Sequence, residues 1–147
     1  AYLGGNIGIP LSNFVTNIKK DDILVLEISD HQLCDMYKFK TNISVLLNIY
    51  QAHIDFHDSF ERYQMMKKRI FNNHNIDDIA IINKDNELCL KLSDDIESNK
   101  MYFSTTSDCD VYIKDNALYY KEEKNGEEFP WNRILTRLYR SGPFWLA

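Results

Sequence analysis

Three short apolar runs, separated by segments with helical periodicity, constrain the fold of this chain more than any other feature. They cover residues 23–28, 43–49 and 79–83. Predominantly apolar runs of this length are typical of strands that are buried on both faces, as in a parallel sheet. Strands that alternate with helices along the chain favour parallel pairing, with the helices packed on the sheet. The sequence therefore predicts an α/β fold built on a parallel sheet.

The segments around these runs have helical patterns. Leu11, Phe14, Val15 and Ile18 lie on one helical face, and Pro10 suits the first turn of such a helix. A short helical stretch is expected over residues 31–37. Asp58 with Glu61 three residues later forms a capping-box pattern and predicts a helix from residue 58 to about residue 73.

The pattern changes after residue 83. Residues 101–104, 110–113 and 118–120 are short strand candidates separated by polar turns. Asp115 and Asn116 form a suitable hairpin turn. These features predict a small antiparallel β appendage after the α/β layer.

Composition excludes several classes of protein. The 147 residues suit one domain and are 44% hydrophobic, with no apolar run of the roughly 20 residues that span a bilayer. A net charge of −5 disfavours a nucleic-acid partner, which attracts a basic surface. Cys34, Cys89 and Cys109 are widely spaced and form neither a CxxC pair nor a zinc framework. No signal peptide is visible, and we expect a cytoplasmic protein.

The two ends differ from the rest of the chain. It begins at Ala1 and reaches Gly4 and Gly5 at once, which suggests a cut through a domain, so we expect a chain truncated at both ends. No lysine follows Lys124, whereas both tryptophans and three of the five arginines lie within residues 130–147. We treat residues 1–129 as a partial domain and residues 130–147 as an atypical tail. The tail is either an amphipathic final helix or a segment that is translated out of frame or joined to foreign sequence.

Polar residues follow each predicted strand, at the edge of a parallel sheet where ligands bind. This placement can bind a hard cation and a phosphorylated ligand. Each of these side chains also has an ordinary surface interpretation. The residues are Glu27, Ser29 and Gln32 after the first run, Asn48, His53, Asp55 and His57 after the second, and Asn83 and Asp85 after the third.

Lys67 stands out in the predicted helix that follows residue 58. It falls on the same arc as the apolar residues Phe60 and Tyr63, whereas Lys68 and Arg69 point away as surface charges. Burial disfavours the charged form of a lysine, and a neutral amine can add carbon dioxide to give a carbamate that holds magnesium. Alternatively, the stem of Lys67 packs while its head reaches solvent.

Four segments, at residues 4–8, 25–33, 48–57 and 63–71, together resemble the central domain of the Mur ligase family. The residues of these motifs are most similar to those of the family member that adds D-glutamate to UDP-N-acetylmuramoyl-L-alanine. The resemblance covers about residues 2–125. It implies a P-loop NTPase-like α/β layer, with ATP and Mg²⁺ as cofactors of the intact enzyme. It further implies Glu27 and His53 as magnesium ligands, Lys67 as the carbamylated lysine, and Asn6 and Ser29 as substrate contacts.

The chain also departs from the family pattern. The family usually has a second serine and an aromatic residue after Ser29, where this chain has Asp30 and His31, and Ala52 replaces the usual acid before His53. No Gly-x-x-x-x-Gly-Lys-Ser/Thr phosphate loop is present in the 147 residues. We therefore expect part of an ATP-dependent, amide-forming ligase of peptidoglycan precursor synthesis, inactive alone. Alternatives are another Mur or folylpolyglutamate-type ligase, or a non-catalytic remnant or binding module.

Overall fold

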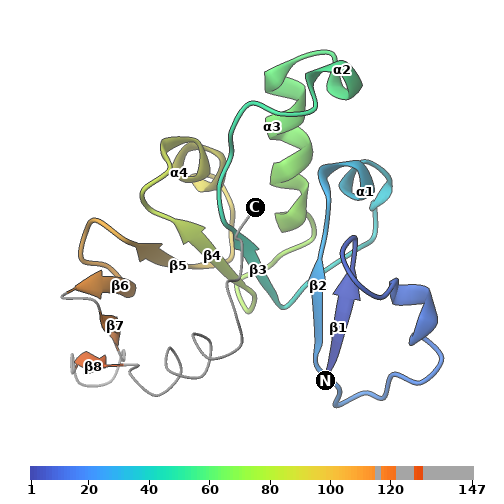
Figure 1. Ribbon diagram of the computed structural model, residues 1–147, viewed down its shortest axis with the longest axis horizontal. Coiled ribbons are helices and arrows are strands. Elements are labelled where there is room, and N and C mark those ends of the chain that lie inside the picture. Colours follow the sequence, from blue (N-terminus) through green and yellow to red (C-terminus); the bar gives the residue numbers. More distant parts are fainter. Residues whose placement is uncertain (115–116, 122–127, 131–147) are drawn as a thin grey trace. The chain divides into compact units, whose positions relative to one another are not determined.

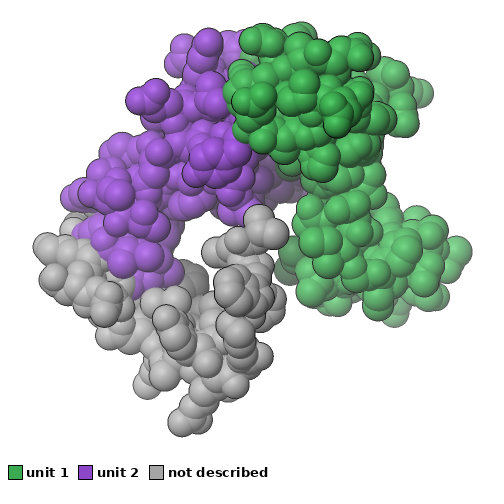
Figure 2. Space-filling view, turned by 45° about the horizontal axis from the view of Figure 1, so that its top comes forward, with its two compact units in different colours: residues 1–40, 51–73 green, residues 41–50, 74–147 purple. Residues whose placement is uncertain are grey.

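The computed structural model describes residues 1–114, 117–121 and 128–130. The chain divides into two compact units, which are coloured separately in Figure 2. Unit 1 comprises residues 1–40 and 51–73, and unit 2 comprises residues 41–50 and 74–147. The fold is mixed α/β with mostly parallel strands, as the sequence predicts. Within the described ranges, no helix is long and apolar enough to cross a bilayer.

Unit 1 contains a parallel pair of strands and a group of short helices (Figure 1). β1 (Tyr2–Gly5) pairs with β2 (Leu24–Glu27) in the register that places Gly5 opposite Glu27. The helices are α1 (Asp30–Asp35), α2 (Ile54–His57) and α3 (Phe60–Lys68), and α3 packs against both of the others. The buried hydrophobic residues of this unit are Phe14, Leu33, Tyr63 and Phe71.

Unit 2 contains a six-stranded sheet in which the strands follow one another in chain order. The pairs from β3 to β6 are parallel, and those from β6 to β8 are antiparallel. The helix α4 (Glu87–Ser93) packs against β4, where Ala80, Ile82 and Cys89 are completely buried. The strands are β3 (Ile43–Leu46), β4 (Ile79–Asn83), β5 (Asn99–Ser104), β6 (Val111–Lys114), β7 (Ala117–Lys121) and β8 (Glu128–Pro130).

The helix predicted from the pattern at residues 11–18 is wrong. Only a 3₁₀ turn, Leu11–Asn13, forms there. Of the four residues on the predicted face only Phe14 is buried, and Val15 is exposed. The segment is rich in serine, threonine and asparagine, whose side chains compete with the backbone for hydrogen bonds and weaken a helix.

The first predicted strand is not buried on both faces. Along β2 the side chains alternate, so that Leu24 and Leu26 are half-buried while Val25 and Glu27 are exposed. β3 alternates in the same way, with Ser44 and Leu46 buried. Successive side chains of a strand point to opposite faces, and each of these strands buries only one face within its unit. The apolar runs therefore predict these two strands correctly but overstate how deeply they are buried.

The predicted antiparallel appendage begins later than expected. β5 and β6 continue the parallel sheet, and α4 joins β4 to β5 where no helix is predicted from the sequence. Asn86 begins this helix, because its side chain accepts a hydrogen bond from the backbone N–H of Cys89. The predicted turn at residues 115–116 lies outside the described residues, although Lys114 pairs with Ala117 in the flanking strands. The tail beyond residue 130 also lies outside them.

The long helix predicted from residue 58 is shorter, and its N-cap lies one residue later than predicted. Ser59 is the N-cap of α3, and its hydroxyl accepts a hydrogen bond from the N–H of Arg62. Asp58 instead ends α2, in the left-handed region with φ of 65°. Aspartate and asparagine tolerate this conformation better than most residues. α3 ends at Lys68 and is followed by the 3₁₀ turn Arg69–Phe71.

Candidate functional site

The carboxyl ends of β1 and β2 bring two predicted site residues together. Gly5 has φ of 121°, and a Cβ atom built there would lie 2.1 Å from the carbonyl oxygen of Glu27, so the close approach requires glycine. The next residue, Asn6, donates its backbone N–H to the same carbonyl at 2.8 Å. Asn6 and Glu27 are both exposed. They are therefore neighbours at the sheet edge where the sequence predicts a ligand.

Ser29, a predicted substrate contact, caps α1 in this structure. Its hydroxyl accepts a hydrogen bond from the backbone N–H of Gln32 at 3.2 Å, and the Gln32 side chain accepts one from the Ser29 N–H at 3.0 Å. This reciprocal arrangement is a capping box. A small pocket of about 150 Å³ lies beside it, lined by Gly5, Gln32 and mainly apolar side chains. Ser29 thus fixes the start of α1 next to a concave surface.

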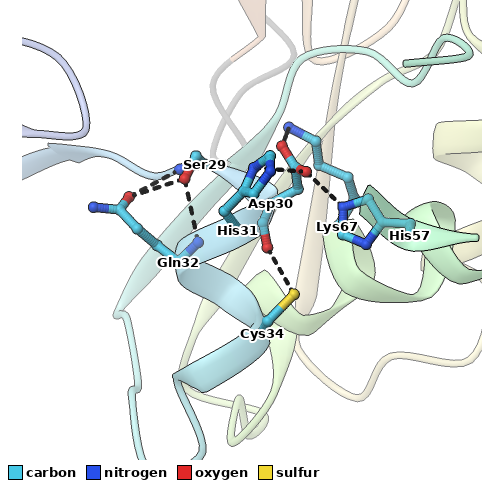
Figure 3. Close-up of polar contacts among 7 residues, drawn as sticks. All are labelled: Ser29, Asp30, His31, Gln32, Cys34, His57 and Lys67. Atoms are coloured by element: carbon cyan, nitrogen blue, oxygen red, sulfur yellow. Dashed lines mark hydrogen bonds and ion pairs between the residues drawn. The ribbon is translucent and has the colours of Figure 1, made fainter. Parts of the chain in front are cut away.

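Asp30 is the first residue of α1 and lies at the centre of a polar cluster (Figure 3). Its side chain is 4% exposed, yet three basic side chains reach it. The fully buried His57 donates from Nε2 to Asp30 Oδ2 at 2.6 Å. His31 Nδ1 lies 3.2 Å from the same oxygen, and Lys67 Nζ lies 3.9 Å from Oδ1. We call these four residues the Asp30 cluster.

The surroundings of Asp30 favour its ionised form. Burial by itself would raise the pKa of this carboxyl, because it disfavours the charge. The hydrogen bond from His57, the backbone donor of Asp30 itself and attraction to Lys67 and His31 act in the opposite direction. Together they hold the pKa of Asp30 below its ordinary value. A buried carboxylate with such partners is a negative charge fixed between α1, α2 and α3.

Lys67 lies on α3 between the packed face and solvent, whereas the helical wheel places it within the packed face. Its side chain is 25% exposed, and its Nζ lies 5.7 Å from the ring centroid of Tyr63. Tyr63 is buried, and burial together with the charge of Asp30 raises the pKa of its hydroxyl. Lys67 is thus held among aromatic and acidic neighbours. The acid beside it is Asp30, which in the sequence is visible only as a departure from a family pattern.

His53 lies close to the same cluster. It precedes α2 in the left-handed conformation, with φ of 53°, and is exposed. Its ring centroid is 5.2 Å from that of His31 and 6.3 Å from that of Tyr63. Glu27, by contrast, has no hydrogen bond or ion pair from its side chain within the described residues. In the same part of the chain, no three histidine, cysteine, aspartate or glutamate side chains gather to hold a metal ion.

Arg69 is not the free surface charge that the helical wheel predicts. Its Nη1 donates to the carbonyl of Cys34 at 2.8 Å and its Nη2 to that of Met36 at 3.5 Å. Its guanidinium also lies 4.9 Å from the ring centroid of Tyr37. These carbonyls belong to the end of α1, where a positive charge is favourable. Arg69 therefore fastens α1 and the end of α3 to each other.

The polar residues after β4 stabilise unit 2. Asn83 donates its side-chain N–H to the carbonyl of Leu47 at 2.7 Å. Asp85 accepts hydrogen bonds from Ser104, from the backbone and side chain of Thr105, and from Thr106. The hydroxyl of Ser104 contributes most to holding the pKa of Asp85 well below its usual range. Asp85 thus joins the end of β4 to the loop that follows β5, and Asn83 joins β4 to the segment that follows β3.

The pairing of Asp30 with His57 is the feature of this site that the sequence did not reveal. His57 is visible as a polar residue after a predicted strand and Asp30 only as a departure from the family pattern, and 27 positions separate them in the chain. Periodicity predicts the helix face on which a residue lies, but it does not predict which charged side chain will pair with that residue. The only available signal was the aspartate directly after Ser29.

The comparisons with known proteins identify the family. A family model described as "Mur ligase middle domain" matches residues 3–147. The chain belongs to the Mur ligase family. The likeness therefore extends over almost the whole sequence, including the segments that carry the site residues.

Two curated Mur ligases show how much of such a protein this chain represents. It is 39% identical over 119 residues to the UDP-N-acetylmuramoylalanine–D-glutamate ligase of Staphylococcus epidermidis, and 38% identical over 120 residues to that of Staphylococcus aureus. These alignments cover 80% and 81% of this chain. They cover 26% of each relative. The chain thus spans about a quarter of the length of the curated relatives it matches.

A solved structure supports the Mur ligase fold. The UDP-N-acetylmuramoyl-L-alanyl-D-glutamate–2,6-diaminopimelate ligase superimposes with a TM-score of 0.53 over 71% of this chain and 24% of that one. The sequences are 23% identical over this match. This likeness concerns the fold.

Proposed function

We propose that this chain is the middle-domain portion of an ATP-dependent ligase that joins D-glutamate to UDP-N-acetylmuramoyl-L-alanine. In that reaction ATP converts a substrate carboxylate into an acyl phosphate, and the amine of D-glutamate then displaces phosphate to form an amide. The observation that carries the proposal is the identity of 38–39% to two ligases named for this activity.

The proposed substrate contacts are Asn6 and Ser29. Asn6 is exposed beside the tight glycine turn at the end of β1, and Ser29 begins α1 beside the small pocket. A sheet edge with a helix start close by is where α/β proteins bind phosphorylated ligands. We propose that the nucleotide-linked substrate lies against this edge in unit 1.

The proposed magnesium ligands are Glu27 and His53. Both side chains are exposed, and a carboxylate such as that of Glu27 suits Mg²⁺, which takes few protein ligands and keeps its other positions for water and phosphate. When bound, the ion would neutralise charge on the transferring phosphoryl group. The residues present therefore fit part of a magnesium site. Lys67 would join them only as a carbamate, because an ammonium repels the ion.

The chain alone should not catalyse ligation. Its sequence has no phosphate loop, and such loops supply much of the electrostatic stabilisation in phosphoryl transfer. We expect the purified chain to form no amide from D-glutamate, ATP and the UDP-linked acid within the detection limit of a phosphate-release assay. Measurable ATP-dependent ligation by the chain would contradict this expectation.

Binding can be tested without turnover. Calorimetric titration with UDP-N-acetylmuramoyl-L-alanine and Mg²⁺ should give saturable binding, which Asn6→Ala weakens about tenfold, the effect of losing one good hydrogen bond. Asn17→Ala is the matched control, because Asn17 is an exposed asparagine of the same unit outside the proposed site. Absence of saturable binding would favour the alternative that the chain is a non-catalytic remnant. Asp30 beside Lys67 is the structural observation that favours this alternative.

A further inference from the structure

The carboxylate of Asp30 lies beside the amine of Lys67. Carbamylation of that amine would therefore place a second carboxylate next to the first. Asp30 Oδ1 is the oxygen that faces Lys67 Nζ, at 3.9 Å, while Oδ2 is engaged by His57 and approached by His31 (Figure 3). Asp30 is 3% exposed, so water screens its charge poorly. The negative charge is therefore directed at the amine of Lys67.

Carbamylation would reverse the sign of the charge at that amine. In the step, the lone pair of the neutral Lys67 amine attacks the carbon of carbon dioxide, and one C=O electron pair moves onto oxygen. The nitrogen then releases a proton to solvent, which leaves a carbamate with one negative charge. Attraction between an ammonium and Asp30 is thus replaced by repulsion between two carboxylates. At about 4 Å and the dielectric near a protein surface, such a pair interacts strongly enough to change an equilibrium at least about tenfold.

The neighbouring groups do not remove this repulsion. A tyrosine hydroxyl carries no positive charge in either protonation state, so the neighbouring Tyr63 cannot offset the charge of a carbamate. His57 is fully buried, and its Nε2 is already committed to Asp30. His31 approaches the oxygen that faces away from Lys67. Within the described cluster, the charge opposite Lys67 therefore remains that of Asp30.

We propose that Asp30 suppresses carbamylation of Lys67, so that the resident form of this lysine is the free ammonium paired with an aspartate. This inference rests on the proposed role of Lys67 as a site for carbon dioxide. It makes carbamate occupancy, and with it any magnesium held there, depend on the residue at position 30. The aspartate acts as an internal competitor of the modification.

The test is ¹³C NMR of the folded chain in ¹³C-bicarbonate and magnesium-free buffer. Wild type should show little or no carbamate signal at Lys67. Asp30→Asn should show a signal at least about tenfold stronger, because the opposing charge is gone. Asp35→Asn is the matched control, since Asp35 is an exposed aspartate of the same helix, and it should behave as wild type. Adding Lys67→Arg to Asp30→Asn identifies the signal by abolishing it.

Each outcome decides between the two proposals. Equal carbamate signals in wild type and Asp30→Asn would overturn the inference but keep Lys67 as the carbamylated residue. No signal in either protein would overturn the role of Lys67 in the proposed function, and the inference with it. Asp30→Ser is a second variant for the case in which asparagine does not fold.

A measurement on the wild-type protein tests the inference even if neither variant folds. Cyanate, like carbon dioxide, adds only to neutral amines, and peptide mass spectrometry follows each lysine separately. We expect Lys67 to react about tenfold more slowly than the exposed Lys20, because its ammonium is paired with Asp30. Reaction of Lys67 at the rate of Lys20 or faster would overturn the inference.

Discussion

Asp30 and His57 form a buried, hydrogen-bonded pair in unit 1. His57→Ala removes the closest partner of a carboxylate that is only 3% exposed, and breaking a buried pair typically costs about 3 kcal/mol or more. His31→Ala removes a partner whose own side chain is 43% exposed, and such pairs are worth less than about 1 kcal/mol. Urea unfolding at pH 7 measures both. Equal losses from the two variants would contradict the account of the cluster.

Asp85 makes stability depend on pH in a predictable direction. Because hydrogen bonds lower its pKa in the folded chain, it stabilises the fold above the pKa of the unfolded chain, about 4, and this contribution is lost as the pH falls toward the folded value. We expect Asp85→Asn to unfold at lower urea concentration than wild type at pH 7, with the difference shrinking below pH 4. Asp77→Asn, at an exposed aspartate, should show no such convergence. A difference that is constant with pH would refute this account of Asp85.

The start of α3 distinguishes two readings of the same sequence. The structure assigns the cap to Ser59, whereas the capping-box pattern suggested Asp58. Ser59→Ala should therefore destabilise the chain by about 1 kcal/mol. Asp58→Asn keeps a residue that tolerates φ of 65° and loses only an exposed ion pair with Arg62, so its effect should stay within about 0.5 kcal/mol. Thermal unfolding measures both variants. A larger loss of stability in Asp58→Asn than in Ser59→Ala would support Asp58 as the N-cap and contradict the structure.

The predictability of the elements followed the strength of their apolar patterns. The run at residues 79–83 became β4 with the predicted bounds, because it is central to its sheet and fully paired. α4 was missed because it is short and begins at a side-chain cap, Asn86, which has no strong apolar pattern before it. The helix predicted at residues 11–18 does not form, although its apolar residues have helical spacing. The serine, threonine and asparagine residues between them disfavour a helix.

For the site as a whole, the sequence predicts which residues lie near the site better than it predicts which charged side chains pair with one another. The strand-end rule points to Glu27, the family resemblance adds Asn6 beside it, and the helical wheel draws attention to Lys67, whose side chain lies at the margin of the packed face. The partner of Lys67 depends on how α1, α2 and α3 pack, and no local pattern contains that information. The same limit applies to Arg69, which meets the carbonyls at the end of a helix 35 residues earlier in the chain.

The central claim is that the carboxyl edge of β1 and β2 binds the nucleotide-linked acid. The most direct test is amide NMR of the ¹⁵N-labelled chain during titration with UDP-N-acetylmuramoyl-L-alanine and Mg²⁺. The account predicts saturable shifts that are largest at Asn6, Glu27 and Ser29, three residues of unit 1. Shifts concentrated in unit 2, or none at concentrations that saturate a curated relative, would contradict it.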